Sequence, residues 1–337
     1  MEVLICESPG TLRYGTRNAP VPGEKETLLR VRRIGICGTD LHAFEGTQPY
    51  FTYPRILGHE LAGEIVEVNG TSAFRSGDIV TFLPYFSCGH CVACRQGKTN
   101  CCADLKVCGV HIDGGMADYL VVPTENLVAG RGIGLDALAL VEPLAIGAHG
   151  IRRANVNSGE PVLVIGAGPI GMGAMQFARL AGADVIALDV DERRLAFCRE
   201  RLGVPYTITA KEDVLTRLRD ITGGDMPAVV IDATGNLNAI QEGFRYMSHG
   251  GRYVLIGLQK GDIAFSHPEF HKREGTLMSS RNATRKDFDQ VVQAISQGAV
   301  DPEAYITHRV TFAAAGEAFP SWLDRKSGVI KAMVMRD

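Results

Sequence analysis

The chain has 337 residues, of which 45% are hydrophobic and 22% charged, and its formal net charge is -3 at pH 7. These values predict a globular protein of two domains, or one large one, with a sizeable buried core. The weak net charge argues against nucleic-acid or membrane-surface partners, and the absence of a run of about 18 apolar residues argues against a membrane span. We therefore expect a cytoplasmic protein.

The first 84 residues contain short alternating apolar runs, such as residues 27–34 and 64–68. Such runs predict strands of a twisted, partly closed sheet. Among them lie Cys37, in the sequence GICGTDLH, and the pair His59 and Glu60. Thiolate, imidazole and carboxylate groups are the ligands of catalytic zinc sites that keep one position open. Taken alone, the same residues also fit a buried apolar cysteine and a hydrogen-bonded histidine.

A cluster of cysteines follows, and its spacing is C-x2-C-x2-C-x7-C. This spacing, together with the odd total of nine cysteines, favours metal binding over disulfide bonds. It predicts a closed, tetrahedral structural zinc site, with Cys101 as an alternative fourth ligand. No basic recognition helix follows, which argues against a nucleic-acid-binding zinc finger. The predicted ligands are Cys88, Cys91, Cys94 and Cys102.

Glu142 precedes Pro143 in the sequence ALVEPLA. Proline restrains the residue before it to an extended conformation and suits the first turn of a helix, so we expect Glu142 at the mouth of a helix over residues 143–153. A carboxylate in this position could bind a metal or simply cap the helix.

The composition then changes to that of a dinucleotide-binding unit. An apolar strand ends at the pattern G-x-G-x-x-G, a helix continues to about residue 181, and a second apolar strand ends at Asp189. Asp189 should bind the adenosine ribose and repel a 2′-phosphate, which favours NAD over NADP, and Arg194 could soften this preference. Two later strands end close to Thr234 and Gly257, where ligands of such sheets bind. The predicted cofactor-binding residues are Gly166, Gly168, Pro169, Ile170, Gly171, Asp189, Arg194, Thr234, Ile256 and Gly257.

Taken together, the motifs GICGTDLH, GHE, the cysteine cluster, VEPL and GAGPIG resemble those of the zinc-dependent medium-chain dehydrogenase/reductase superfamily, in the same order and over essentially the whole chain. The resemblance implies an α/β protein in which a GroES-like β-rich catalytic domain is combined with a Rossmann domain, a doubly wound parallel sheet. The expected catalytic domain covers residues 1–144 and 281–337, with a structural-zinc lobe at about 85–108, and the Rossmann domain covers residues 145–280. The resemblance also implies a homodimer or homotetramer, two zinc ions per chain, and Cys37, His59, Glu60 and Glu142 as the groups around the catalytic zinc.

Glu142 stands where alcohol dehydrogenases of this superfamily carry a second cysteine. With a glutamate at this position, the motif VEPL resembles that of the polyol, threonine and sugar-acid dehydrogenases. Residues 271–284 are similar to bacterial hexonate 5-dehydrogenases of the L-galactonate and L-gulonate type. This resemblance implies NAD-dependent oxidation of a secondary hydroxyl of a sugar acid, with Arg281 binding the carboxylate and Asn282 a hydroxyl. A polyol or L-threonine dehydrogenase is the alternative, although Ala43 replaces a tyrosine that sorbitol dehydrogenases often carry.

The expected mechanism begins with a zinc ion that lowers the pKa of the substrate hydroxyl. Thr39 takes the proton and passes it towards the ribose hydroxyls and His42, and NAD accepts the hydride. The spacing is also compatible with a purely structural His42. A non-catalytic NAD-sensing scaffold is the hypothesis from a different class, and zinc-free quinone reductases are a third. The intact set of zinc-binding residue types argues against both.

Overall fold

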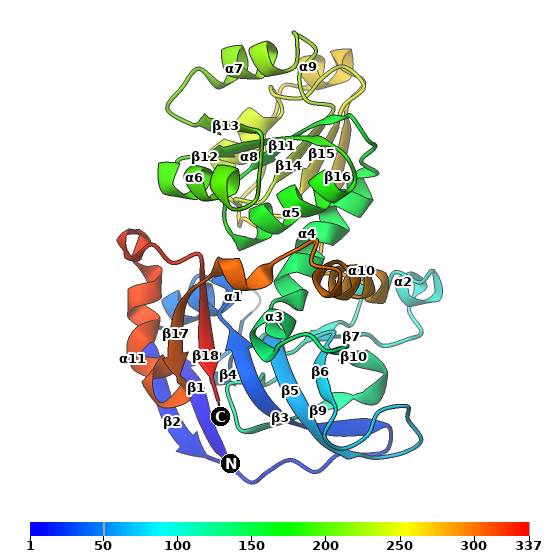
Figure 1. The fold of residues 1–337 in the computed structure, drawn as a ribbon, viewed down its shortest axis with the longest axis vertical. Helices are drawn as coiled ribbons and strands as arrows, with labels where there is room; N and C mark the ends of the chain where they lie inside the picture. Colours follow the sequence, from blue (N-terminus) through cyan, green and yellow to red (C-terminus); the bar gives the residue numbers. More distant parts are fainter. Residues whose placement is uncertain (50, 337) are drawn as a thin grey trace. The chain divides into compact units, whose positions relative to one another are not determined.

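The computed structural model describes residues 1–49 and 51–336, apart from the side chain of Arg325. The chain forms two compact units (Figure 1). Residues 1–142 and 283–337 form the first, called here the β-rich unit, and residues 143–282 form the second, the parallel-sheet unit. The two boundaries each lie two residues from the positions that we expected from the sequence, 144/145 and 280/281.

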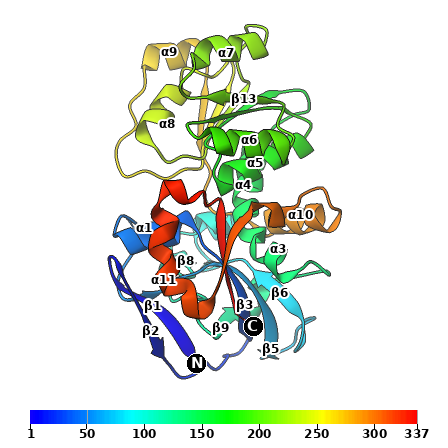
Figure 2. The same cartoon turned by 60° about the vertical axis from the view of Figure 1, so that its left-hand side comes forward.

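The β-rich unit is built on a seven-stranded sheet that joins the two ends of the chain. Strand β18 near the C-terminus pairs antiparallel with β3 near the N-terminus, so the tail completes a sheet begun by the first residues (Figure 2). Apolar side chains of both segments share one buried core, which includes Ile34 and Val334. The strand order is β10 (Leu127–Ala129), β6 (Ile79–Phe82), β5 (Glu60–Val68), β3 (Glu26–Gly35), β18 (Lys331–Met335) and β17 (Ile306–Thr311), with β9 (Tyr119–Pro123) also paired to β3.

Smaller elements complete this unit. A three-stranded sheet has the order β2 (Thr11–Thr16), β1 (Glu2–Ser8) and β4 (Arg55–Ile56), and the two-stranded pair β7 (Tyr85–Phe86) and β8 (Lys106–Val107) flanks the cysteine cluster. The helices are α1 (Gly38–Glu45), α2 (Val92–Arg95), α3 (Leu135–Ala139), α10 (Arg285–Ser296) and α11 (Phe312–Leu323). The 3-10 helices are η1 (Thr99–Cys101), η2 (Thr124–Asn126), η3 (Pro302–Tyr305) and η4 (Arg325–Ser327).

The parallel-sheet unit contains six strands, and every neighbouring pair runs parallel. Their order is β13 (Tyr206–Thr209), β12 (Asp184–Asp189), β11 (Pro161–Ile165), β14 (Val229–Asp232), β15 (Arg252–Leu255) and β16 (Thr276–Ser279). Helices α5 (Pro169–Leu180) and α6 (Glu192–Glu200) cover one face, and α8 (Leu237–Gly243) lies on the other (Figures 1 and 2). The helices α7 (Val214–Ile221) and α9 (His267–Lys272) complete the unit. Because the strand order reverses beside β11, the predicted doubly wound sheet is confirmed.

Helix α4 (Val141–Ala154) corrects one local expectation. Glu142 is the second residue of this helix and is not extended. The steric effect of a following proline disfavours a helical residue without forbidding it. Pro143 still lies in the first turn, where its missing N–H costs no intrahelical bond.

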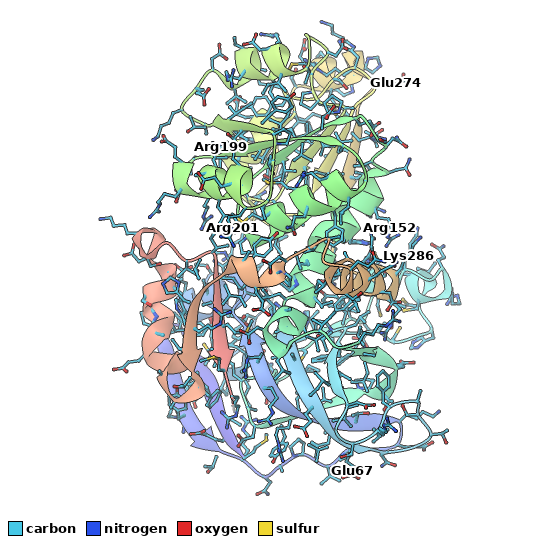
Figure 3. All side chains as sticks on the ribbon, in the orientation of Figure 1. Glu67, Arg152, Arg199, Arg201, Glu274 and Lys286 are labelled. Atoms are coloured by element: carbon cyan, nitrogen blue, oxygen red, sulfur yellow. The ribbon has the colours of Figure 1, made fainter. Side chains whose placement is uncertain are left out.

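Burial follows residue type in both units. Strands β11 and β14 are buried along almost their whole length, as expected for a parallel sheet that is covered on both faces. Charged side chains such as Glu67 and Glu274 are exposed and point away from the ribbon (Figure 3). Within the part of the chain that the structure describes, no helix is both long and apolar enough to cross a membrane.

Candidate metal and cofactor sites

Cys37, His59 and Glu60 converge on one point of the β-rich unit, where their ligand atoms all lie within 4.8 Å of one another. Strand pairing brings them together. Gly35, the last residue of β3, pairs with Glu60, the first residue of β5. Cys37 follows the end of β3 and His59 precedes the start of β5, so the pairing places them close together. In a tetrahedral zinc site with bonds of about 2.0 to 2.3 Å, the ligand atoms lie roughly 3.3 to 3.8 Å apart. The donor types and spacing therefore fit a zinc ion after a small contraction.

Asp40 supports this cluster and was not assigned a role from the sequence. Its buried carboxylate accepts hydrogen bonds from the backbone N–H groups of Cys37, at 2.9 Å, and Gly58, at 3.2 Å. Its Oδ1 also lies 3.8 Å from Nδ1 of His59, a buried atom that has no hydrogen-bond partner among the described residues. Metal-binding histidines commonly turn their second nitrogen towards a carboxylate in this way. Asp40 therefore fixes the backbone at Cys37 and at the residue before His59, and its carboxylate faces the imidazole.

Lys331 is a second unpredicted neighbour, and it comes from the opposite end of the chain. Its Nζ donates to both carboxylate oxygens of Glu60, each at 2.7 Å, and to the backbone carbonyl of Ile36 at 3.1 Å. Burial alone would lower the pKa of Lys331, but the charges of Glu60, Cys37 and Glu142 and the hydrogen bond to Glu60 together outweigh burial and raise that pKa. A glycine is needed at position 35, because a Cβ there would lie 2.2 Å from Oε2 of Glu60.

Glu142 lies close to this cluster but, among the described residues, is not one of the three that share the 4.8 Å limit. Its carboxylate is buried and accepts a hydrogen bond from the hydroxyl of Tyr85. Burial raises the pKa of Glu142 to about 7, and Glu60 adds to the rise while His59 opposes it. Glu142 is therefore a buried carboxylate beside the cluster and is not a solvent-exposed helix cap.

Thr39 and His42 lie on one face of α1, three residues apart, directly after Cys37. Thr39 is half-buried and His42 is exposed. The Nδ1 atom of His42 lies 3.1 Å from Oγ1 of Thr47 and 3.3 Å from Oε2 of Glu45. His42 thus lies at the solvent-exposed side of α1, bonded to groups on its own segment.

The four predicted cysteines of the lobe also form one group, with all sulfur atoms within 4.8 Å of one another. Cys102 is part of this group and is buried, whereas Cys101 is exposed and, in the described structure, lies outside it. Backbone N–H groups point at the sulfurs, and the contact from Ala103 contributes most to lowering the pKa of Cys91 to about 6. Four converging thiols with such donors fit a closed, tetrahedral metal site.

The glycine-rich loop follows β11 as the pattern predicts. Gly166 has a φ angle of 99°, a conformation that residues with a Cβ rarely adopt. A Cβ on Gly171 would lie 1.8 Å from the carbonyl oxygen of Gly166, so only glycine allows the helix to pack so closely on the loop. Gly168 precedes the first turn of α5, which begins with Pro169 and Ile170. The backbone N–H groups at the start of α5 that follow Pro169 can bind phosphate.

Asp189 ends β12 beside this loop. One carboxylate oxygen accepts from the N–H of Ala167 at 2.5 Å, and the other accepts from the N–H of Asp191 at 2.8 Å. The guanidinium of Arg194 lies near Gly168, since its Nη1 is the atom that a Cβ on this glycine would meet, at 3.9 Å. The structure thus brings Asp189 and Arg194 to the glycine-rich loop.

The ends of β14 and β15 lie next to each other. A Cβ on Gly257 would lie 2.1 Å from the backbone nitrogen of Gly235, which shows how closely the two loops pack. Thr234 is exposed, and its hydroxyl donates to the buried carboxylate of Asp232 at 2.6 Å. Ile256 and Gly257 are half-buried at the same edge of the sheet.

Arg281 and Asn282 belong to the parallel-sheet unit, at its last two residues. Arg281 is exposed, and Asn282 adopts a left-handed backbone conformation with φ of 54°. Asparagine tolerates this conformation better than most residues. Their assignment to substrate binding stays a prediction.

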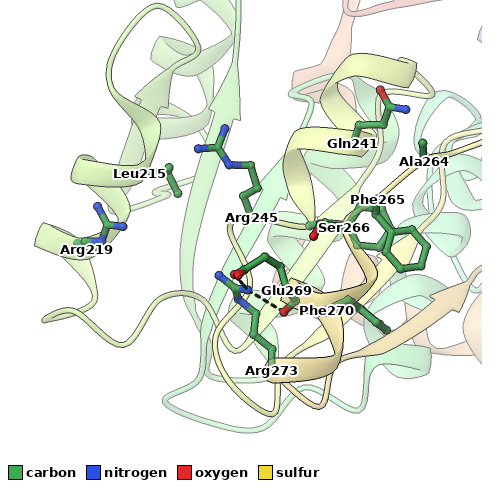
Figure 4. A pocket seen from close by; sticks show the side chains of 11 residues that line it. Leu215, Arg219, Gln241, Arg245, Ala264, Phe265, Ser266, Glu269, Phe270 and Arg273 are labelled. Carbon is green, nitrogen blue, oxygen red and sulfur yellow. Dashed lines mark hydrogen bonds and ion pairs between the residues drawn. The ribbon is translucent and has the colours of Figure 1, made fainter.

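A cavity of about 670 Å³ lies elsewhere in the parallel-sheet unit, between α7, α8 and α9 (Figure 4). Phe244, Phe265 and Phe270 contact one another along it, and Arg273 forms an ion pair with Glu269. None of the predicted cofactor-binding residues lines this cavity. The dinucleotide loop and this cavity are therefore separate features of the unit.

Family comparison agrees with the fold. Residues 23–131 match the alcohol dehydrogenase GroES-like domain, and residues 169–297 match the zinc-binding dehydrogenase family. The chain belongs to the zinc-type alcohol dehydrogenases of the medium-chain dehydrogenase/reductase superfamily, which confirms the resemblance seen in the sequence. It is therefore an oxidoreductase of the class that acts on CH–OH groups with a nicotinamide cofactor.

Individual relatives are similar to this chain over nearly its whole length. The chain is 44% identical to L-galactonate-5-dehydrogenase of Escherichia coli K12, over 99% of this chain and 98% of the relative. It is 30% identical to 2-dehydro-3-deoxy-L-galactonate 5-dehydrogenase of Pseudoalteromonas atlantica, over 94% and 93% of the two chains. A crystal structure of an alcohol dehydrogenase from E. coli CFT073 complexed with NADH superimposes with a TM-score of 0.93 at 31% identity, covering 100% and 99% of the chains.

Proposed function

We propose that this enzyme oxidises a secondary hydroxyl of a hexonate such as L-galactonate or L-gulonate to the keto acid, with NAD as hydride acceptor. The observation that carries the proposal is the 44% identity to an L-galactonate-5-dehydrogenase over nearly the whole of both chains. The glutamate at position 142 and the intact Cys37, His59 and Glu60 cluster agree with it. The proposed assembly is a cytoplasmic homodimer or homotetramer.

The proposal assigns two zinc ions to each chain. Cys37, His59 and Glu60 would hold the catalytic ion, and Cys88, Cys91, Cys94 and Cys102 would hold the structural ion. A bound zinc ion makes a coordinated hydroxyl acidic near neutral pH. Asp40 fixes the backbone of Cys37 and Gly58, and Lys331 fixes the carboxylate of Glu60, so the chain itself positions these groups.

Within this chemistry, Thr39 would accept the hydroxyl proton while passing its own towards the ribose hydroxyls of the cofactor and His42, which exchanges a proton with solvent. The half-buried position of Thr39 and the exposed position of His42 support this order. The glycine-rich loop and the start of α5 bind the pyrophosphate, Asp189 binds the adenosine ribose, and Thr234, Ile256 and Gly257 border the cofactor. Arg281 pairs with the substrate carboxylate, and Asn282 binds a hydroxyl.

A substrate panel tests the proposal most directly. The purified enzyme is supplied with NAD or NADP and with hexonates, polyols and L-threonine, and reduced cofactor is followed by absorbance. We expect the highest kcat/KM for a hexonate with NAD, and a metal assay that finds two zinc ions per chain. A preference for sorbitol, galactitol or threonine over every hexonate would instead support the alternative polyol or threonine dehydrogenase. Absence of turnover with every substrate would favour the non-catalytic scaffold.

A further inference from the structure

The cavity between α7, α8 and α9 has a flat aromatic wall. Phe265 stacks on Phe244, with 4.5 Å between the ring centroids and 15° between the ring planes, and Phe270 meets both rings at steep angles. Phe244 is 8% exposed and belongs to the apolar core of the unit, whereas Phe265 is 40% exposed. The wall is thus anchored on the core, and the part of the Phe265 ring that does not pack on Phe244 is open to a ligand.

Three arginines, Arg219, Arg245 and Arg273, line the same cavity. Glu269 is the one acidic residue among the described residues that line it. Arg273 forms an ion pair with Glu269, and Arg245 forms one with Glu242, each at 2.8 Å. A guanidinium carries more N–H donors than one carboxylate engages, so both arginines keep donors beyond these pairs. The lining therefore carries a surplus of positive charge in a protein whose formal net charge is -3.

Arg219 is the least engaged of the three. It lies on the α7 side of the cavity, whereas Phe265 lies on the side of α8 and α9 (Figure 4). Its guanidinium forms no hydrogen bond or ion pair with any residue that the structure describes, although Asp213 is close enough for their charges to interact. A guanidinium binds a carboxylate through two parallel hydrogen bonds. A ligand that carries an acidic group on a planar ring therefore matches both sides of this cavity.

We propose that the cavity is a second binding site of this protein, for a planar aromatic carboxylate whose ring stacks on Phe265 and whose acidic group pairs with Arg219. Its volume of about 670 Å³ falls within the range of about 300 to 1,000 Å³ that is usual for small-molecule sites. A singly charged group suits the site better than a doubly charged phosphate, because Glu269 in the lining repels added negative charge. The inference goes beyond the proposed function and does not depend on it, since the cavity is lined by none of the predicted zinc or cofactor ligands.

Isothermal titration calorimetry with 2-naphthoate as the probe tests the site. The purified enzyme is first saturated with NAD, so that the dinucleotide loop is occupied. We expect 2-naphthoate to bind with a dissociation constant below about 1 mM. Its uncharged analogue 2-naphthamide, which keeps the ring, and acetate, which keeps the charge, should each bind at least about tenfold more weakly, because each lacks one of the two contacts.

Two variants locate the bound probe. Arg219→Gln removes the exposed guanidinium, and Phe265→Leu keeps an apolar side chain but removes the ring. Each should weaken the binding of 2-naphthoate by about three- to tenfold. Arg217→Gln is the matched control, because Arg217 also lies on α7, pairs with Glu212 at 3.1 Å and is not among the described residues that line the cavity. This control should bind the probe as the wild type does.

Two results would overturn the inference. Unchanged affinity in both Arg219→Gln and Phe265→Leu would place the probe outside the cavity. Absence of binding to the wild type would do the same, including the case in which a second copy of the chain covers the cavity, which sedimentation would show as a loss of the oligomer in Phe265→Leu. Because Arg219 is an exposed surface residue, its variant decides the question even if Phe265→Leu folds poorly. Neither result bears on the proposed function, which the substrate panel tests separately.

Discussion

The ammonium group of Lys331 donates to both carboxylate oxygens of Glu60, each at 2.7 Å, and the two side chains are 3% and 0% exposed. The contact joins residues 271 positions apart, because β18 pairs with β3 and β3 pairs with β5. The C-terminal strand thus contributes directly to the predicted catalytic site.

Lys331→Met should be strongly destabilising, because it leaves the Glu60 carboxylate buried without its partner. Breaking one half of a buried ion pair typically costs about 3 to 5 kcal/mol of unfolding free energy. Urea unfolding of enzyme without a metal ion at the Cys37 site measures the effect, because a zinc ion there would itself compensate the carboxylate. Lys331→Met combined with Glu60→Gln should be more stable than Lys331→Met alone, since no unpaired charge remains. Equal stability of the single and double variants would contradict the assigned role of the pair.

Cys37→Ala should abolish turnover and lower the zinc content from two ions per chain to one. The remaining ion belongs to the cysteine lobe, whose four sulfurs come from a different segment. Zinc analysis and circular dichroism of the purified variant provide the measurement. Cys6→Ala is a suitable control, because Cys6 is also a free cysteine of the β-rich unit and belongs to neither cluster. Full activity in Cys37→Ala with one zinc lost would rule out the proposed mechanism.

Asp189→Ala should raise the KM for NAD by about 10- to 100-fold and relax the discrimination against NADP. In the proposed function the carboxylate binds the ribose, and in the structure it holds the loop through Ala167 and Asp191. Steady-state kinetics with the two cofactors provide the test. Asp191→Ala is the matched control, since Asp191 caps α6 and pairs with Arg193. An unchanged ratio of NAD to NADP efficiency in Asp189→Ala would place cofactor selection elsewhere.

Arg281→Ala should lower kcat/KM for a hexonate by roughly 30- to 1,000-fold and spare a neutral polyol, because a paired charge-assisted contact is worth about 2 to 4 kcal/mol. Kinetics with an acid and a polyol separate recognition from general damage. Lys272→Ala, at the exposed end of α9, removes a similar charge and should change neither value. Parallel losses on both substrates would argue that Arg281 supports the fold.

The metal-free enzyme should lose stability as the pH rises from about 4.5 to 8, through the titration of Glu142. Burial raises the pKa of this group from 4.5 to about 7 in the folded state, so the folded protein binds its proton more tightly than the unfolded chain. The stabilisation is complete below pH 4.5 and is lost as the pH rises through 7, by up to about 3 kcal/mol. Chemical unfolding of the wild type and Glu142→Gln across this range isolates the contribution. Identical pH profiles would show that Glu142 does not titrate there.

The local sequence determines much of this protein. The spacing of Cys88, Cys91, Cys94 and Cys102 specifies their convergence, because a few residues of chain span so short a distance. The glycines at 166, 168 and 171 likewise specify the turn in which they lie. The apolar runs before and after this turn predict strands of a parallel sheet. Such patterns depend on residues that are close in the chain, and they can therefore be recognised from the sequence alone.

The tertiary structure decides the contacts that join distant segments. Nothing near Lys331 in the sequence indicates a buried ion pair with Glu60, and nothing near Tyr85 indicates a bond to Glu142. Both follow from strand and helix packing across more than fifty residues. The helical conformation of Glu142 is also decided by tertiary packing, because Pro143 by itself favours an extended conformation for the residue before it. The local sequence thus identifies the candidate ligands. The tertiary packing determines that Glu60 is paired with Lys331 and Glu142 with Tyr85.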